Sequence, residues 1–303
     1  MAEGIVLYET VHGSRAYGLA RAGSDTDLKG VLVGPRAWYF GYRGGPEQVE
    51  LSPDHVRYEV RKFLRLVANA NPTVLETLFT RPEDHRVVTP GGERLLAARE
   101  GFLTRRVAES FGRYAHGQLR KIETHRQWLL HPPSAAPSRE DFGLPERTLV
   151  PRDQLGAAEA LLERGETPAI TAPFLDVLAR EKRYRSAKKR WSQYQQWTRH
   201  RNPARAALEA AHGYDTKHAM HLVRLQRMAI EILERGEVIV HRPDAESLLA
   251  IRDGALPYDA LLEEARGNVA RIKAAEATSP LPADPDEDAI EALGIALIEE
   301  ALR

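Results

Sequence analysis

Two acidic residues near the N-terminus have the spacing of a metal-binding pair. Asp25 and Asp27 are separated by one residue at the start of the apolar run 28–33, so on a β-strand both side chains point to the same face. Two carboxylates held that close repel each other unless a divalent cation lies between them. Mg²⁺ (or Mn²⁺) suits such oxygen ligands and usually shares them with substrate phosphates. The pair therefore predicts a metal site for phosphoryl or nucleotidyl transfer.

A glycine–serine step before the acidic pair predicts a phosphate-binding turn. Gly13 and Ser14 follow the β-rich run 4–11 and precede a short segment, 15–21. Glycine permits close backbone approach, a serine hydroxyl can donate, and the amides at the start of a helix face an anion. An isolated Asp-Thr-Asp is usually a turn or a helix cap, but its combination with Gly13 and Ser14 between two expected strands favours catalysis.

A third carboxylate is expected from a later strand, and three residues are candidates. Glu59, Asp54 and Glu50 all lie in or beside the expected extended segments 47–51 and 55–59. Glu59 is the first choice because it ends the segment 55–59, in which the odd positions share one face. Asp54 and Glu50 remain open as alternatives.

These residues together resemble the polymerase-β-like nucleotidyltransferase superfamily, whose signature is a Gly-Ser step followed by Asp-x-Asp on a strand. Within that superfamily the chain is similar to the RNA-repair-pathway polymerase-β-like nucleotidyltransferase family. The segments that carry this similarity are 13–18, 24–30, 58–63, 71–79, 213–224, 242–246 and 251–254. The family pattern also places a Tyr-Glu dipeptide at the third carboxylate, which here is Tyr58-Glu59.

The resemblance implies a magnesium-dependent enzyme that transfers a nucleoside monophosphate from an NTP, with ATP as the expected donor, to an acceptor hydroxyl. The expected acceptor is an RNA (tRNA-like) end in RNA repair or processing. The alternative is modification of a protein or small-molecule hydroxyl, as in toxin- or antitoxin-like relatives. A non-catalytic nucleotide-binding regulator is a third possibility, against which the intact acids argue.

The pattern of elements predicts an α+β fold. Residues 1–92 are expected to form a small nucleotidyltransferase palm, a mixed sheet with helices, and residues 93–303 an all-helical domain. Loops are expected at 131–150 and 277–286. After the helix 60–70, the helical ranges are 93–100, 102–130, 152–164, 174–201, 204–211, 215–235 and 244–252. The segment 237–241 suits either a strand or an extended connector.

The expected helix 215–235 carries a cationic stripe. Lys217, His221 and Arg224 recur on one helical face while the opposite face is apolar. Lysine as a point charge and arginine as a fork suit triphosphate oxygens, so these three residues are candidate nucleotide ligands. A solvated face with helix salt bridges is the alternative.

The segment 181–201 is the best candidate for nucleic-acid binding. It holds eight Lys or Arg against one acid, with four aromatic residues interleaved. Cations suit a phosphate backbone and aromatic rings suit unstacked bases. The candidate RNA ligands are Arg185, Lys188, Lys189 and Trp191. The equal alternative is that the aromatic rings pack in a core and the charged side chains form a solvent-exposed face.

Composition excludes several other classes. The chain of 303 residues has 43 Lys+Arg and 43 Asp+Glu, which argues against a surface that binds polyanions throughout but allows a local basic groove. The absence of cysteine removes disulfides, thiolate catalysis and cysteine zinc sites. No apolar signal stretch follows Met1 and no run is long enough to span a membrane, so a cytoplasmic protein is expected.

Overall fold

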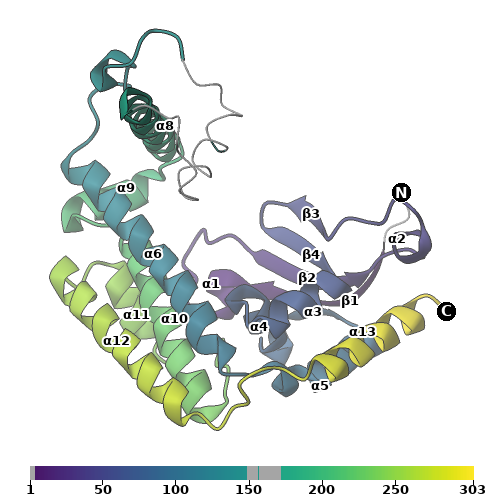
Figure 1. Ribbon diagram of the computed structural model, residues 1–303. Helices are drawn as coiled ribbons and strands as arrows, with labels where there is room; N and C mark the ends of the chain where they lie inside the picture. Colours follow the sequence, from purple (N-terminus) through teal and green to yellow (C-terminus); the bar gives the residue numbers. More distant parts are fainter. Residues whose placement is uncertain (1–3, 149–155, 157–171) are drawn as a thin grey trace. The chain divides into compact units, whose positions relative to one another are not determined.

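The computed structural model describes residues 4–148, 156 and 172–303 (Figure 1). Its contacts divide the chain into two compact units. The first unit consists of Met1–Glu123 and Tyr214–Arg303, and the second of Thr124–Gly213. The expected boundary after residue 92 was placed where strands give way to helices in the sequence, and it remains a prediction. The expected helix 152–164 and the end of the expected loop 131–150 lie outside the described residues.

The first unit contains a mixed five-stranded sheet in the order β3-β4-β2-β1-β5. The strands are β1 (Ile5–His12), β2 (Asp27–Val33), β3 (Gln48–Ser52), β4 (His55–Glu59) and β5 (His85–Val88). The β2 and β4 strands run parallel, and the other neighbours pair antiparallel. The α+β class and the mixed sheet are therefore confirmed; β5 was not expected from the sequence.

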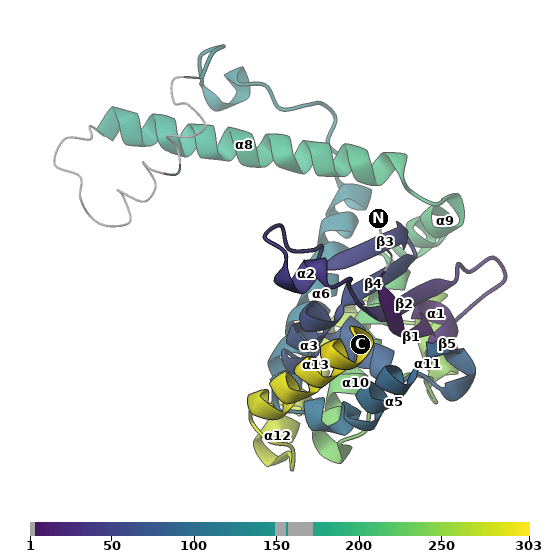
Figure 2. The same ribbon diagram turned by 90° about the vertical axis from the view of Figure 1, so that its right-hand side faces the viewer.

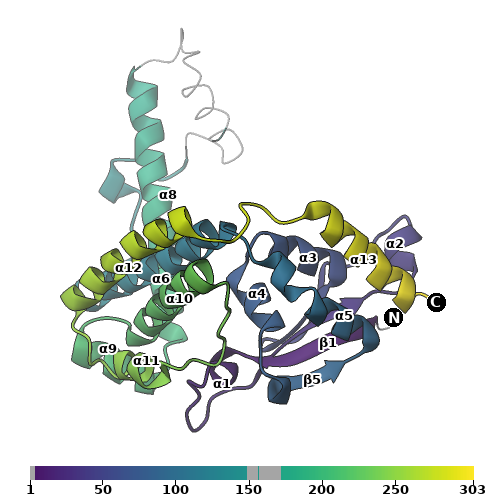
Figure 3. The same ribbon diagram turned by 90° about the horizontal axis from the view of Figure 1, so that it is seen from below.

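Helices cover the sheet and extend beyond it. The first unit holds α1 (Gly13–Ala16), α2 (Ala37–Phe40), α3 (Val60–Ala68), α4 (Pro72–Leu78), α5 (Pro90–Ala97), the first part of α6 (Arg106–Leu130), α10 (Thr216–Arg235), α11 (Ala245–Arg252), α12 (Tyr258–Thr278) and α13 (Glu287–Ala301). Figure 3 shows α13 alongside α3 and α5, where the three helices pack on strands β1, β2 and β4. The apolar residues of α3 recur at helical spacing, and its four buried residues all belong to the hydrophobic core.

One hydrophobic core joins the sheet, its covering helices and the C-terminal helices. It includes Phe63 and Leu75 beside the sheet and Val223 and Ile232 on α10. The α10 helix packs against both α11 and α12. The C-terminal helices are thus part of the same packed unit as the sheet. In the sequence, the second unit separates the two segments of the first.

The second unit is helical in its described part. It contains the end of α6, the long helix α8 (Ala172–Arg199), which is continuous in Figure 2, and α9 (Pro203–His212). Trp128 on α6 lies with its ring centroid 5.7 Å from that of Tyr194 and 5.4 Å from that of Trp197, both on α8. Aromatic residues of the basic segment therefore pack inside this unit.

The helices that match an expected range to within four residues are α3, α5, α6, α8, α9, α10 and α11. No helix was expected at α2, α4 or α12. The segment 237–241 is an extended connector rather than a strand. Within the described ranges, none of the helices combines the length and the apolar character that crossing a membrane would require.

Candidate active site

The glycine of the Gly13–Ser14 turn lies directly against the carboxylate of Asp27. His12 and Asp27 are paired residues at the ends of β1 and β2. Gly13 has a φ of +68°, and a Cβ placed on it would be 1.9 Å from Oδ2 of Asp27. Only glycine fits both the left-handed backbone and this close approach. The sequence thus brings the turn and the acidic pair together, as expected.

Asp27 lies in a strongly charged environment. Burial raises the pKa of its carboxyl, and the neighbouring carboxylates of Asp54 and Asp25 raise it further. Lys29 and Lys217 act in the opposite direction. The charges of two further carboxylates and two ammonium groups therefore act on Asp27 at the start of β2.

The structure brings Asp54, rather than Glu59, to this point. Leu28 is paired with His55 in the parallel β2–β4 ladder, and the amide of Leu28 donates to the carbonyl of Asp54 at 2.7 Å. Asp54 is consequently level with Asp27. Glu59 is level with Leu32, and five residues of strand span roughly 16 Å. The preference for Glu59 is corrected for this reason, and Asp54, one of its two alternatives, takes its place.

Glu59 has a structural role, because its buried side chain caps the N-terminus of α3. It accepts from the amides of Arg61 and Lys62, and its Oε1 accepts from the hydroxyl of Tyr39 at 2.9 Å. Glu50 is exposed on the edge strand β3, where its carboxylate accepts from Gln48. Neither carboxylate is available to the Asp25–Asp27 pair.

The donor set fits a hard divalent cation. Asp25, Asp27 and Asp54 supply only oxygen ligands, which is the ligand chemistry that Mg²⁺ and Mn²⁺ select. The raised pKa of Asp27 reflects like charges that a cation between them would neutralise. The residues therefore fit the expected metal, with Asp54 in place of Glu59.

Lys217 and His221, two of the three residues of the cationic stripe on α10, differ in exposure and in charge. Lys217 is exposed, and its charge acts on Asp27. His221 is partly buried; burial, together with the charges of Arg224 and Lys217, lowers the pKa of its ring well below the usual value. Lys217 can contact an anion as a cation, whereas His221 is a neutral hydrogen-bonding group at pH 7.

Arg224, the third residue of the stripe, is buried. Its Nη1 donates to Oε1 of Glu76 on α4 at 2.7 Å, and its side chain is only 6% exposed. A guanidinium that is already paired inside the core has no free face for a triphosphate. We therefore do not propose Arg224 as a nucleotide ligand.

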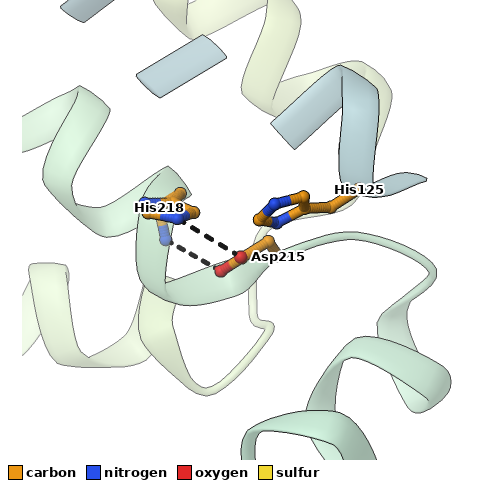
Figure 4. A group of neighbouring side chains, drawn as sticks. All are labelled: His125, Asp215 and His218. Atoms are coloured by element: carbon orange, nitrogen blue, oxygen red, sulfur yellow. Dashed lines mark hydrogen bonds and ion pairs between the residues drawn. The ribbon is translucent and has the colours of Figure 1, made fainter. Parts of the chain in front are cut away.

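The start of α10 is fixed by its own cap. The carboxylate of Asp215 accepts from the amide of His218 at 3.0 Å and lies 3.6 Å from the Nε2 atom of the same residue (Figure 4). This N-cap orients the first turn of the helix, on which Lys217 is located.

The candidate RNA ligands lie on α8 in the second unit. Lys188 and Lys189 are exposed, while Arg185 is partly buried 3.9 Å from Glu181. The ring of Trp191 is partly buried 5.8 Å from the ring of Tyr194. Two of the four candidates are thus open to solvent, and the other two contact their own helix.

Sequence reasoning attached no role to Lys29 or Glu76. Glu76 is a lone carboxylate in the apolar helix PTVLETL, and a charge in such a run signals a buried partner. Lys29 follows Asp27 on the same strand face, so the period-2 alternation that pairs Asp25 with Asp27 could have included it.

Comparisons with known proteins find a family match in the N-terminal part of the chain. The family model described as RlaP, the RNA repair pathway DNA polymerase beta family, matches residues 2–130. An uncharacterized protein of Bacillus subtilis (strain 168), YcgL, is 35% identical over 78 residues, which cover 24% of this chain and 30% of YcgL. The chain thus aligns with less than a third of that relative's length. No solved structure matches. The segment 2–130, which carries the Gly13 turn and all three carboxylates, is thus similar to the RNA repair pathway DNA polymerase beta family.

Proposed function

We propose that the protein is a metal-dependent nucleotidyltransferase that moves a nucleoside monophosphate from an NTP to an acceptor hydroxyl. The observation that carries this proposal is that the carboxylate of Asp27 lies against Gly13 and is acted on by the charges of Asp54 and Asp25. Clustered carboxylates beside a side-chain-free turn suit a triphosphate accompanied by Mg²⁺ or Mn²⁺. The polymerase β family of residues 2–130 supports the same chemistry.

Each residue of the centre has a separate role in this proposal. Asp25, Asp27 and Asp54 would hold the divalent cation, which when bound neutralises phosphate charge and lowers the pKa of an attacking hydroxyl. Gly13 leaves room for the carboxylate of Asp27, and the Ser14 hydroxyl would donate to phosphate oxygens. Lys217 contributes a positive charge near the same phosphates, and His221 a neutral hydrogen bond.

We propose ATP as the donor and an RNA end as the acceptor. The family description names an RNA repair pathway, and α8 offers exposed lysines beside partly buried aromatic rings. Such a surface suits a single-stranded or tRNA-like backbone.

The test is a labelling experiment with each NTP carrying a labelled α-phosphate, Mg²⁺, and either total tRNA or total protein as acceptor. The proposal expects label in the RNA fraction, and none when the label is on the γ-phosphate, because the pyrophosphate leaves. Label in the protein fraction would replace RNA by a protein acceptor. No transfer from any NTP to either fraction would refute nucleotidyl transfer.

A further inference from the structure

A buried ionic cluster lies directly behind the Gly13–Ser14 turn. Its centre is Glu76 on α4, whose side chain is 1% exposed. The hydroxyl of Tyr17, at the end of α1, donates to Oε2 of Glu76 at 2.5 Å. Arg224 on α10 donates to the other oxygen, Oε1, at 2.7 Å. One carboxylate thus joins three elements that are distant in the sequence.

The members of the cluster also contact one another. The guanidinium carbon of Arg224 is 3.9 Å from the centre of the Tyr17 ring, which is the geometry of a cation–π contact. Nε2 of His12 is 3.6 Å from Oε2 of Glu76. Burial lowers the pKa of His12 to about 4, against the opposing charge of Glu76, so the ring is neutral and the cluster contains one negative and one positive charge.

The chain that follows the turn is held by C-terminal residues at further points. The carbonyl of Tyr17 accepts from the amide of Arg242 at 3.1 Å, and that of Leu19 accepts from Arg252 at 3.3 Å. Arg21 forms an ion pair of 2.5 Å with Asp253. These contacts come from α11 and the residues on either side of it, and all of them lie within the first unit.

Such a cluster is better suited to specifying geometry than to adding stability. A buried ion pair costs desolvation of both charges, and well-packed apolar residues of the same volume often stabilise a protein as much or more. Hydrogen bonds from Tyr17 and Arg224 to the two oxygens of Glu76, however, fix direction as well as distance. The element whose direction they fix is α1, which contains Gly13 and Ser14.

We propose that Tyr17, Glu76 and Arg224 are positioning residues that fix the Gly13–Ser14 turn in its nucleotide-binding geometry. The C-terminal helix α10, which lies beyond the segment 2–130 that matches the family, thereby sets the shape of the phosphate site. This inference rests on the proposed function, because the effect is transmitted to nucleotide bound at that turn.

The test compares two buried tyrosines in the full-length protein. Tyr17→Phe removes the hydroxyl that donates to Glu76 but keeps the ring beneath Arg224. Tyr8→Phe is the matched control, since the buried hydroxyl of Tyr8 donates to the carbonyl of Thr77 at 3.0 Å and meets no part of the turn. Tyr17→Phe loses one buried hydrogen bond and Tyr8→Phe loses two, because the hydroxyl of Tyr8 also lies 2.9 Å from that of Thr80. A purely structural role therefore predicts that Tyr17→Phe lowers the melting temperature and the nucleotide affinity no more than Tyr8→Phe does.

The expected result is that Tyr17→Phe weakens the affinity for a non-hydrolysable ATP analogue with Mg²⁺ by about tenfold, the scale of a hydrogen bond to a charged group. Tyr8→Phe should leave that affinity unchanged while both variants lower the melting temperature. Equal affinities of the two variants would overturn the inference. If the wild-type protein binds no NTP, the proposed function fails instead, so the two failures are distinguishable.

A double variant shows whether the effect passes through the turn. If Tyr17 acts by placing Ser14, then in the Ser14→Ala background the change Tyr17→Phe should weaken affinity much less than in the wild type. Independent effects, in which the two losses multiply, would refute positioning through the turn.

Discussion

Asp27 has a carboxylate whose negative charge is disfavoured by its own surroundings. Burial and the charges of Asp54 and Asp25 raise its pKa, which means that its ionised form destabilises the metal-free fold near neutral pH. Residues that bind a cation commonly carry such a cost, because the arrangement that suits the ligand is strained without it.

Replacing this residue should therefore stabilise the metal-free protein. We expect Asp27→Asn to raise the melting temperature at pH 7 in the presence of a chelator by about 1–3 °C, because it removes one of three repelling charges. Added Mg²⁺ should raise the melting temperature of the wild type but not of the variant. Calorimetry with chelator and with Mg²⁺ measures both effects; a variant that melts below the wild type in chelator would contradict this account of the site.

At the scale of elements, the end of β1 and the start of β2 form the site through a single close contact. Gly13 has no room for a side chain because the carboxylate of Asp27 occupies that space. The strand pairing that places His12 opposite Asp27 produces this contact. A side chain at Gly13 should therefore displace Asp27 rather than merely strain the backbone.

A pair of glycine variants separates these two effects. Gly13 and Gly23 have φ angles of +68° and +79°, but a Cβ on Gly23 would meet nothing within 4 Å. Alanine at either position should cost about 1 kcal/mol of stability through backbone strain. Gly13→Ala should also abolish measurable Mg²⁺ and nucleotide binding, whereas Gly23→Ala should retain both. Titration calorimetry decides this, and equal binding by the two variants would show that the close contact is not needed.

The sequence predicted the strands of the site but not their register. Alternating apolar residues locate β1, β2 and β4 to within a residue or two, and the Asp-x-Asp spacing identifies the acidic pair. The parallel pairing of β2 with β4, however, joins strands that are not neighbours in the chain, and no local pattern reports how far one is shifted along the other. The alternation of side chains between the two faces of a strand therefore favoured Glu59. The register, however, places Asp54 level with Asp27.

The short helix α4 shows a similar limit. Its Asn71 cap and Pro72 start are readable in the sequence, but the partner of Glu76 is 148 residues away on α10. The cationic spacing of α10 selected Lys217, whose charge acts on Asp27. The same spacing also selected Arg224. Periodicity shows on which face of its helix a residue lies, but it does not show which other part of the chain packs against that face.

At the scale of the whole molecule, the chain returns to its first unit after the second. The sheet, α10, α11, α12 and α13 share one hydrophobic core, and residues 124–213 form the separate helical unit. Composition along the chain shows where strands end, but it does not show which helices pack on the sheet. This is why the α+β class could be predicted while the grouping of the helices could not.

The second unit carries the surface that we propose for RNA. Replacing Arg185, Lys188 and Lys189 with alanine should weaken RNA binding and reduce its salt dependence. Each lost phosphate contact should lower the log–log salt slope by about 0.7 for a single strand or 0.9 for a duplex. Fluorescence anisotropy over a range of salt concentrations measures both quantities. The two exposed lysines should account for most of the change, because Arg185 already lies near Glu181.

The control for this variant is nucleotide binding at the first unit, which should be unchanged because the acids and the Gly13 turn are not altered. An unchanged affinity and an unchanged slope for RNA would mean that the charges of α8 form a solvated face. A protein acceptor would then become the better explanation of any transfer observed.

The most direct test of the account compares the transfer rates of Asp54→Asn and Glu59→Gln. The two variants each remove one negative charge from β4 or its preceding turn, and only Asp54 is level with the acidic pair. We predict that Asp54→Asn lowers kcat by at least ~10²-fold, the scale of losing one preorganised charged group. Glu59→Gln should keep kcat within a few-fold of the wild type while lowering stability by about 1 kcal/mol through the weakened cap of α3. Near wild-type transfer by a folded Asp54→Asn, together with loss of transfer in a folded Glu59→Gln, would contradict the assignment of the three aspartates as the catalytic centre.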